Sequence, residues 1–259
     1  MAGGYTAHGP MRKDSPMPNP TAAMLVIGDE ILSGRTRDSN AHALARALTL
    51  HGMDLRQIRV VGDVADTITT AARALSETHD HLFTSGGIGP THDDITADCI
   101  AAVTGAPIGV RDDAREILAR HYAERGTELN DSRLRMARIP DGATLIANPV
   151  SAAPGFSLGN IHVLAGVPQI FDAMLAGLLP RLAGGTPVAS RTLTLDRGEG
   201  DIAQTLSRVA QEHPALSLGS YPSWTGDGYR VAVVVRGADD DEIGAAIGKL
   251  RAAFPEARE

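Results

Sequence analysis

Short runs of apolar residues alternate along the chain with longer segments in which apolar residues recur at helical spacing. Residues 22–27 are apolar at every position, which is typical of a strand buried on both faces of a parallel sheet. From Asn40 the apolar residues follow one helical face as far as Gly52, a residue that readily ends a helix in the left-handed conformation. Further elements of the same kind are predicted as strands at 57–61 and 81–84 and a helix at 66–78. The order strand, helix, strand, helix, strand predicts a mostly parallel α/β unit.

The rest of the chain continues this unit and then changes its pattern. Helices are predicted at 95–104 and 112–125, a strand at 161–165, and a helix from Pro168 whose inward side chains are Phe171, Met174, Leu175 and Leu178. After glycine and proline at 183–187, a small βαββα unit of α+β type is predicted, with elements at 191–195, 201–213, 215–220, 229–236 and 239–254. We therefore expect an α/β domain at 21–183 and a small domain at 187–259. Residues 1–20, rich in glycine and proline, predict a disordered tail.

Charge and cysteine content exclude several classes of protein. The 24 Lys and Arg residues against 31 Asp and Glu give a net charge of −7, and no basic run occurs, so non-specific binding to nucleic acid is not expected. Cys99 is the single cysteine, which excludes an internal disulfide and a zinc ribbon, and we expect it to be a small core residue. No apolar run of about 18 residues and no secretory signal is recognisable. These features favour a cytoplasmic protein with neither a membrane nor a nucleic-acid partner.

The segment 84–96, Thr-Ser-Gly-Gly-Ile-Gly-Pro-Thr-His-Asp-Asp-Ile-Thr, carries the strongest chemical signal. It follows a predicted buried strand, and ligands of open parallel sheets bind beyond the carboxyl ends of the strands. Because glycines let backbone N–H groups crowd around an anion, the segment predicts a phosphate cradle, with candidate contacts at Ser85, Gly86, Gly87, Gly89 and Thr91. Asp93 and Asp94 would repel a phosphate unless a divalent cation such as Mg²⁺ lay between them. The alternative is a tight turn in which Asp93 or Asp94 caps the next helix.

Two further loops are predicted to meet the same edge of the sheet. Gly28, Asp29 and Glu30 follow the first strand and Asp63 follows the second, so their carboxylates and amides can face the same crevice. Each loop also has a structural interpretation, as a solvated turn or a helix cap, and Asn40 is either a ligand contact or the cap of its helix. The sequence leaves both interpretations open.

Small residues later in the chain can either approach a ligand or turn the backbone, and the turn is the stronger interpretation for Gly155, Gly166 and Pro168. Among nine histidines only His92 lies within a candidate site, and without an HExxH motif or a Cys/His cluster a zinc site is not expected. Neither a GxSxG motif nor a Walker A motif is present. Serine hydrolase and P-loop chemistry are therefore unsupported.

Three segments resemble one protein family. Residues 26–34 (VIGDEILSG), 85–96 (SGGIGPTHDDIT) and 153–156 (APGF) resemble the molybdopterin-binding domain (MoaB/Mog type) of molybdenum-cofactor biosynthesis proteins. They are most similar to the N-terminal part of competence/damage-inducible protein A (CinA) and to the matching domain of eukaryotic FAD synthase. The resemblance covers about 22–182, and the small domain is similar to the KH-like domain that follows in this family. One departure is Ser151-Ala152, where the family usually has Gly-Thr.

The resemblance implies a three-layer α/β/α domain in a homo-oligomer, either a dimer or a trimer. It also implies that the glycine segment holds the phosphate of a pterin or a nucleotide, that Asp63 and Asp94 bind a divalent metal, and that ADP-ribose or FAD is hydrolysed. In both reactions water attacks a phosphoanhydride while a metal neutralises charge on the phosphate oxygens. The deamidase domain of full-length CinA proteins is not matched, so deamidation of nicotinamide mononucleotide is not expected.

We therefore predict a nucleotide pyrophosphatase that depends on a divalent metal. Asp63 and Asp94 would hold Mg²⁺ or another divalent cation, and Asp93 or His92 would orient the attacking water. The predicted substrate contacts outside the glycine segment are Gly28, Asp29, Glu30, Asn40, Gly155, Gly166 and Pro168. Two alternatives remain open: a non-catalytic protein that binds molybdopterin or a nucleotide, and an enzyme that adenylylates molybdopterin with ATP.

Overall fold

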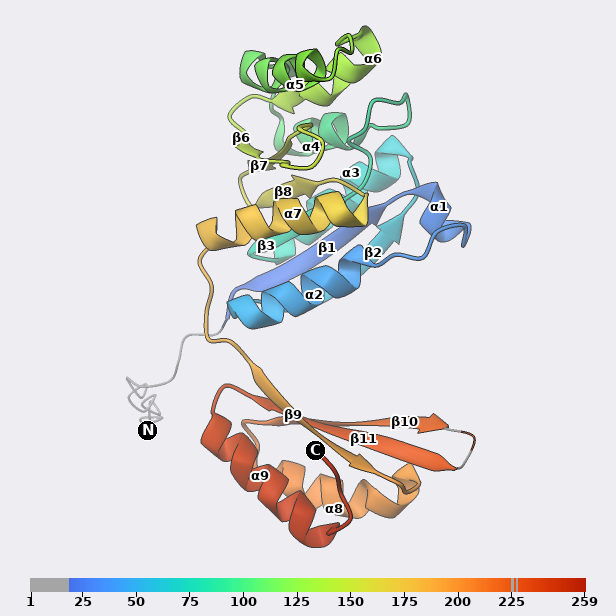
Figure 1. Ribbon diagram of the computed structural model, residues 1–259. Coiled ribbons are helices and arrows are strands. Elements are labelled where there is room, and N and C mark those ends of the chain that lie inside the picture. Colours follow the sequence, from blue (N-terminus) through green and yellow to red (C-terminus); the bar gives the residue numbers. More distant parts are fainter. Residues whose placement is uncertain (1–18, 225, 227) are drawn as a thin grey trace, which may run out of the picture.

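A six-stranded sheet organises the larger unit of the computed structural model, which describes residues 19–224, 226 and 228–259 (Figure 1). In spatial order its strands are β2 (Asp54–Val61), β1 (Thr21–Ile27), β3 (His81–Ser85), β8 (Ile161–Leu164), β7 (Gly155–Leu158) and β6 (Thr144–Ile146). The first four are parallel, and β7 and β6 extend the sheet in antiparallel fashion. The predicted mostly parallel α/β fold is confirmed. The predicted tail lies outside the described residues, apart from Asn19 and Pro20.

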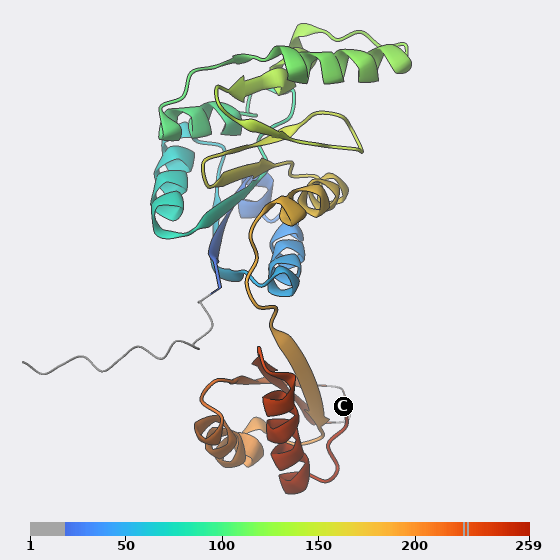
Figure 2. The same cartoon turned by 90° about the vertical axis from the view of Figure 1, so that its left-hand side faces the viewer.

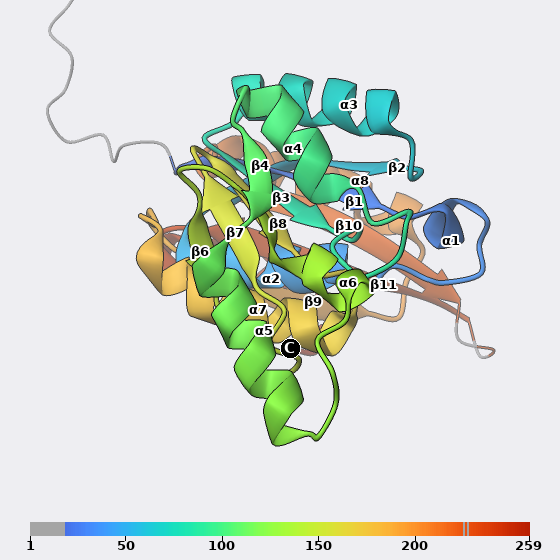
Figure 3. The same ribbon diagram turned by 90° about the horizontal axis from the view of Figure 1, so that it is seen from above.

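Helices cover both faces of this sheet, because successive residues of a strand point to opposite sides. One set of β1 side chains joins a core with α3 (Ala65–Thr78) and α4 (Thr96–Thr104). The other set joins a core with α2 (Asn40–His51) and α7 (Pro168–Leu178). Figure 3 shows these two helix pairs on opposite sides of the sheet. The uninterrupted apolar run of β1 reflects this double burial.

Two of the residues predicted to start or end a helix, Pro168 and Gly52, act as expected. Gly52 adopts φ 75° and ψ 37° and closes α2 in the left-handed conformation. Pro168 is the first residue of α7, whose four predicted inward side chains are all buried. Cys99 is buried as well, and burial raises the pKa of its thiol to about 11, so the prediction of a core residue is confirmed.

Short elements are where the structure departs from the sequence prediction. Four strands of the large unit were not predicted: β6 and β7 of the main sheet, and β4 (Ile108–Val110) and β5 (Arg138–Pro140), which pair antiparallel with each other. Between them lie α5 (Asp112–Glu124), α6 (Asp131–Leu134) and the 3-10 turn η1 (Arg135–Ala137). Single-turn elements also follow β1 and α7, namely α1 (Asp29–Leu32) and η2 (Leu179–Arg181). Segments of three or four residues are too short to display a hydrophobic period, so the pattern of the sequence does not reveal them.

The second unit has the βαββα order that the sequence predicts. Its elements are β9 (Ala189–Leu195), α8 (Glu199–Glu212), β10 (Ser217–Trp224), β11 (Tyr229–Gly237) and α9 (Asp240–Ala253). The strands form an antiparallel sheet in the order β10-β11-β9. Alternate residues of β11, Val231, Val233 and Val235, are buried in a core shared with both helices. The strand predicted at 215–220 begins later and ends four residues farther along, at Trp224.

Residues 183–188 connect the two units (Figure 2). The Asn19 side chain makes two hydrogen bonds to Thr186 in this connection. Its Nδ2 donates to the Thr186 carbonyl oxygen at 3.0 Å, and its Oδ1 accepts from Thr186 N–H at 2.8 Å. The carbonyl oxygen of Pro20 accepts from Asp54 N–H at 2.9 Å. Of these two residues, both assigned by the sequence to the tail, Asn19 is therefore bonded to the connection and Pro20 to the large unit. In the part of the chain that the structure describes, all helices are too short or too polar to cross a membrane.

Candidate functional site

A crevice of about 530 Å³ lies beyond the carboxyl ends of the parallel strands β1, β2, β3 and β8. Each strand is followed by residues that line it: Gly28 after β1, Asp63 after β2, Gly86 after β3 and Gly166 after β8. Its volume falls within the range of small-molecule sites, and ligands of parallel α/β sheets bind at this edge. The structure brings together most of the predicted contacts here, namely Gly28, Glu30, Asp63, Gly86, Gly87, Gly89, Asp93, Asp94, Gly166 and Pro168.

The glycine segment reverses direction in a way that side chains would prevent. Gly86 has φ 105°, and a Cβ there would lie 2.2 Å from the carbonyl oxygen of Ile27. Gly87 has φ 66°, and a Cβ there would lie 2.2 Å from Oγ1 of Thr96. Positive φ and contacts this close are compatible only with glycine, so these two residues shape the crevice floor.

Some of the backbone donors of this segment are already used, and others are available. Gly86 N–H donates to the carbonyl oxygen of Leu164 at 3.3 Å, which ties β3 to β8. The N–H groups of Gly87, Ile88 and Gly89 have no hydrogen-bond partner among the described residues. Consecutive unpaired amides beside a helix are a recurring arrangement for binding phosphate. The available donors therefore lie at 87–89, and Gly86 contributes its conformation.

Asp63 carries a carboxyl group whose environment opposes ionisation. Burial raises the pKa of Asp63, and the nearby negative charges of Asp29, Glu30 and Asp93 raise it as well. A hydrogen bond of 2.9 Å from Asp29 N–H to Oδ2 acts in the opposite direction. The effect of Asp93 shows that the loops after β2 and β3 lie within electrostatic reach of each other. A perturbed acid in a crevice is characteristic of a functional site.

Asp94 is partly engaged by its own loop. Its Oδ2 accepts from Thr91 N–H at 2.8 Å and from the Thr91 hydroxyl at 2.5 Å, whereas Oδ1 has no partner among the described residues. The residue that precedes α4 as its N-cap is Ile95, and no side chain caps this helix. The alternative that Asp93 or Asp94 caps the helix is therefore wrong. Asp94 keeps one carboxylate oxygen for a ligand.

Two carboxylates at the crevice, those of Asp63 and Asp94, are the candidates for holding a cation. Mg²⁺ is usually held by one or two carboxylates together with substrate phosphate oxygens, and Asp63 and Asp94 both line the crevice. Within the described residues, no three His, Cys, Asp or Glu side chains are grouped closely enough to hold a metal on their own. Asp63 and Asp94 are thus candidate ligands of a cation only together with oxygen atoms supplied by a ligand.

Asn40 proves to be a positioning residue rather than a cap or a lining residue. The N-cap of α2 is Ser39, and Oδ2 of Asp38 accepts from the N–H of Ala41 at 3.1 Å, so the prediction that Asn40 caps the helix is wrong. Its buried Nδ2 donates to Oγ of Ser85 and to the carbonyl oxygen of Gly166, each at 2.7 Å. Asn40 therefore fixes the ends of β3 and β8 against each other. It and Ser85 lie beneath the crevice, so the prediction of direct substrate contacts is not supported for this pair.

Two residues of the glycine segment, Thr91 and His92, do not line the crevice, although both were predicted to act on the substrate. The His92 side chain is almost fully exposed, 4.0 Å from Asp93, and does not line the crevice. Thr91 gives both its N–H and its hydroxyl to Asp94 and does not line the crevice either. The predicted roles of His92 in orienting water and of Thr91 in holding phosphate are therefore corrected.

Gly155 and Asp29 also lie outside the lining of the crevice. Gly155 begins β7, and a Cβ there would lie 2.2 Å from the carbonyl oxygen of Val163. The missing side chain allows two strands to pack, which is a structural role. Asp29 acts through its backbone N–H on Asp63, while its Oδ1 lies against Gly62, where a Cβ would come within 2.3 Å.

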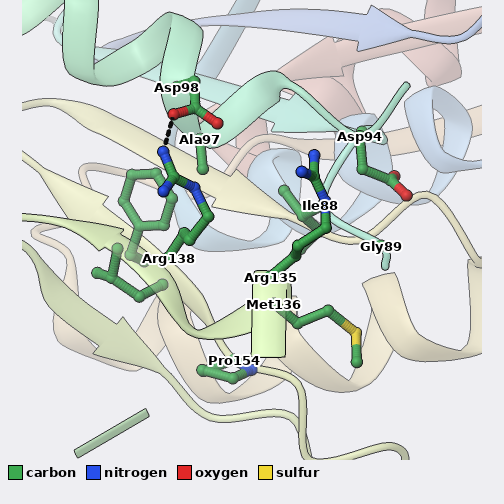
Figure 4. Close-up of a pocket in the computed structure, with 12 residues that line it drawn as sticks. Ile88, Gly89, Asp94, Ala97, Asp98, Arg135, Met136, Arg138 and Pro154 are labelled. Atoms are coloured by element: carbon green, nitrogen blue, oxygen red, sulfur yellow. Dashed lines mark hydrogen bonds and ion pairs between the residues drawn. The ribbon is translucent and has the colours of Figure 1, made fainter. Parts of the chain in front are cut away.

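The remaining walls of the crevice come from the loop 148–153 and from η1. The sequence alone gives little indication that either segment lies at the site. Asn148 organises the loop 148–153: its Nδ2 donates to Oγ of Ser151 and to the carbonyl oxygen of Ala153, and its Oδ1 accepts two backbone N–H groups. An Asn-Pro pair signals such a turn, and the loop both turns and lines the crevice. Met136 and Arg135 come from η1, where no motif marks them, and Arg135 lines a smaller cavity beside Gly89 and Asp94 (Figure 4).

Comparison with known protein families gives two matches that divide the chain at the connection between its units. Residues 23–184 match the family described as "Probable molybdopterin binding domain". Residues 187–258 match the family described as "FAD synthase, middle domain".

Individual relatives agree with these matches. A protein of Pyrobaculum calidifontis is 35% identical over 212 residues, which are 78% of this chain and 81% of that protein. A CinA-like protein of Desulfosudis oleivorans is 35% identical over 209 residues, which are 76% of this chain and 51% of that protein. The crystal structure of CinA from Thermoplasma acidophilum, described as a protein of unknown function, is 36% identical with a TM-score of 0.58 and covers 62% of this chain and 98% of that one. The resemblance inferred from the sequence is confirmed.

Proposed function

This chain belongs to the family of probable molybdopterin-binding domains, and we propose that it is a nucleotide pyrophosphatase that hydrolyses a phosphoanhydride with the help of a divalent cation. The observation that carries the proposal is the meeting of three unpaired backbone amides, at 87–89, with the carboxylates of Asp63, Asp93 and Asp94 at one crevice. Amides recognise the phosphate, and the carboxylates make a cation necessary. The match of residues 187–258 to the middle domain of FAD synthase is the reason to test FAD beside ADP-ribose.

Each group has a separate task in this proposal. Asp63 and Asp94 would hold the cation, which supplies positive charge against the negative charge that develops on the phosphate oxygens. The N–H groups of Gly87, Ile88 and Gly89 bind the phosphate that is attacked. Asp93 orients a water molecule; the water oxygen forms a bond to phosphorus while the bond from phosphorus to the bridging oxygen breaks, and two monophosphates leave.

The first test measures hydrolysis directly. Purified protein with Mg²⁺, Mn²⁺ or Co²⁺ is expected to release AMP from ADP-ribose or from FAD, and EDTA is expected to abolish the release. Asp94→Asn should lower kcat by about 100-fold or more, because the variant still accepts a hydrogen bond from Thr91 but loses the charge that holds the cation. Asp196→Asn, on the small unit, is the control and should leave kcat unchanged. Absence of turnover on every dinucleotide would reject the proposal.

A second candidate is a protein that binds a pterin or a nucleotide without converting it, and the family description favours it. In that case calorimetry should detect binding of molybdopterin or a nucleotide, and Asp94→Asn should change the affinity while no product forms. Light scattering of the same samples tests the expected homo-oligomer and separates a dimer from a trimer.

A further inference from the structure

Arg135 has a position that the mechanism above does not use. It lies on η1 and lines a cavity of about 20 Å³ together with Gly87, Gly89 and Asp94. All three of these residues also line the large crevice, so the two spaces adjoin along the glycine segment. Figure 4 shows the Arg135 side chain rising from η1 beside Ile88, on the side of the segment where Asp94 lies.

The charge of Arg135 is unpaired, in contrast to its neighbours in the chain. Arg138 forms an ion pair with Asp98, and the guanidinium of Arg133 lies 4.6 Å from the centroid of the Tyr122 ring. The Arg135 side chain makes no hydrogen bond or ion pair with any described residue, and its Nε is buried without a partner. A buried donor on a charged group is costly to leave unsatisfied, so the arrangement calls for a hydrogen-bond acceptor from outside this chain, which is either a water molecule or a ligand oxygen.

The size and surroundings of the cavity restrict what this partner can be. About 20 Å³ holds a single water-sized group, so an oxygen atom fits and a nucleobase does not. Residues 87–89, whose N–H groups have no partner among the described residues, line the same cavity. Arg135 and Arg138 are the basic residues that line either space, and Arg138 is already paired with Asp98. Arg135 is thus the unpaired cation among these lining residues.

We propose that Arg135 binds an oxygen of the substrate's diphosphate and positions it against the amides of the glycine segment. A guanidinium presents several donors in a fixed plane and binds phosphate more specifically than an ammonium does. This assignment rests on the proposed function, because it takes the ligand to be a diphosphate. The experiment below measures binding and not hydrolysis, so the role of Arg135 and the pyrophosphatase activity can fail separately.

The experiment is calorimetric titration of inorganic pyrophosphate and of ADP, each with and without Mg²⁺, into the full chain. Arg135→Gln should raise Kd for pyrophosphate by about 10- to 100-fold, as expected for loss of a hydrogen bond to a charged group. Arg135→Lys should restore part of the affinity, since it returns the charge without the planar fork. Arg133→Gln, two residues away in sequence, is the matched control and should bind as the wild type does.

A second measurement does not depend on how well Arg135→Gln folds. The Nε–H resonance of Arg135, identified by its loss in Arg135→Lys, should shift when pyrophosphate is added to the wild-type protein. A shift in this resonance together with weaker binding by Arg135→Gln supports the assignment.

Four further outcomes separate the two ideas. Equal affinity of Arg135→Gln and wild type overturns the role of Arg135, even if ADP-ribose or FAD is hydrolysed. A wild-type protein that does not bind pyrophosphate overturns it too. An unmoved Nε–H resonance at saturating pyrophosphate also overturns it. Binding that depends on Arg135, without any hydrolysis, upholds the role of Arg135 and rejects the pyrophosphatase.

Discussion

The crevice of the large unit and the surface of the small unit use charged side chains in opposite ways. In the small unit, Asp196 is paired with both Arg230 and Arg258, and its hydrogen bond with Arg230 is the main cause that lowers the pKa of Asp196. In the crevice, Asp63 has no basic partner among the described residues, and burial raises its pKa. An ion pair satisfies both charges within the chain, whereas a buried carboxyl without a basic partner in a crevice is characteristic of a ligand-binding site.

The backbone also has features at the crevice that side chains would disturb. At the crevice, Gly86, Gly87 and the non-glycine residue Ala152 have positive φ. In the small unit, Gly248 lies within helix α9 and a Cβ there would meet no atom within 4 Å. Strained backbone conformations gather at functional sites because the surrounding structure holds them there. Burial of the Asp63 carboxyl and the positive φ of Ala152, in the loop 148–153, therefore both oppose stability in this part of the large unit.

The largest expected effect on stability comes from replacing Gly86 by alanine, which adds a methyl group at the crevice floor. Gly86→Ala places Cβ 2.2 Å from the carbonyl oxygen of Ile27 at φ 105°, so it should lower the free energy of unfolding by about 3 kcal/mol. Gly248→Ala, the matched substitution in α9, should raise it by about 0.5–1 kcal/mol. Urea denaturation followed by circular dichroism measures both. A loss below about 1 kcal/mol for Gly86→Ala would show that the loop relaxes and that the floor is not rigid.

The long elements of the fold could be predicted from the sequence because many residues report the same period. Residues 22–27 predict β1, and the four inward side chains of α7 predict its buried face. The crevice also followed from the sequence, because the carboxyl ends of parallel strands share one edge and each of the loops there carries an acid or glycines.

The parts that were missed depend on contacts between distant segments. An asparagine at the start of a helix is most often a cap, and only the placement of Ser85 and Gly166 beside Asn40 reveals its role. Arg135 lies in a short turn without a motif, and it follows Gly87 by 48 residues in the chain (135 minus 87). The sequence therefore does not indicate that these two residues line one cavity. The side-chain direction of His92 likewise depends on the loop conformation and not on its neighbours in the chain.

A smaller effect is expected at Ala152, a strained residue in the loop 148–153 that contributes to the crevice wall. Ala152 has φ 63°, in the left-handed region that glycine adopts without a steric penalty. Ala152→Gly should therefore raise the free energy of unfolding by about 0.5–1 kcal/mol, with part of the gain offset by the greater freedom of glycine in the unfolded chain. Urea denaturation checks this value. Ala153→Gly, the next residue along the loop, is the control and should be destabilising, so equal effects at the two positions would contradict strain at Ala152.

The smallest effects, which test the contrast of charges most directly, are the dependences of stability on pH. Because the pKa of Asp63 is raised in the folded state, its contribution to stability is fully present below the ordinary carboxyl pKa of about 3.9 and is lost as pH rises through the raised value. Asp63→Asn should therefore raise Tm at pH 7 in EDTA, and this gain should vanish near pH 4.

Because the pKa of Asp196 is lowered, its contribution is present above about 3.9 and is lost as pH falls through the lowered value. Asp196→Asn should accordingly lower Tm at pH 7 and have no effect in strong acid. Thermal melts of both variants from pH 3 to pH 7 measure the two signs, and a decrease of Tm at pH 7 in both would mean that the carboxylate of Asp63 is satisfied within the chain and requires no ligand.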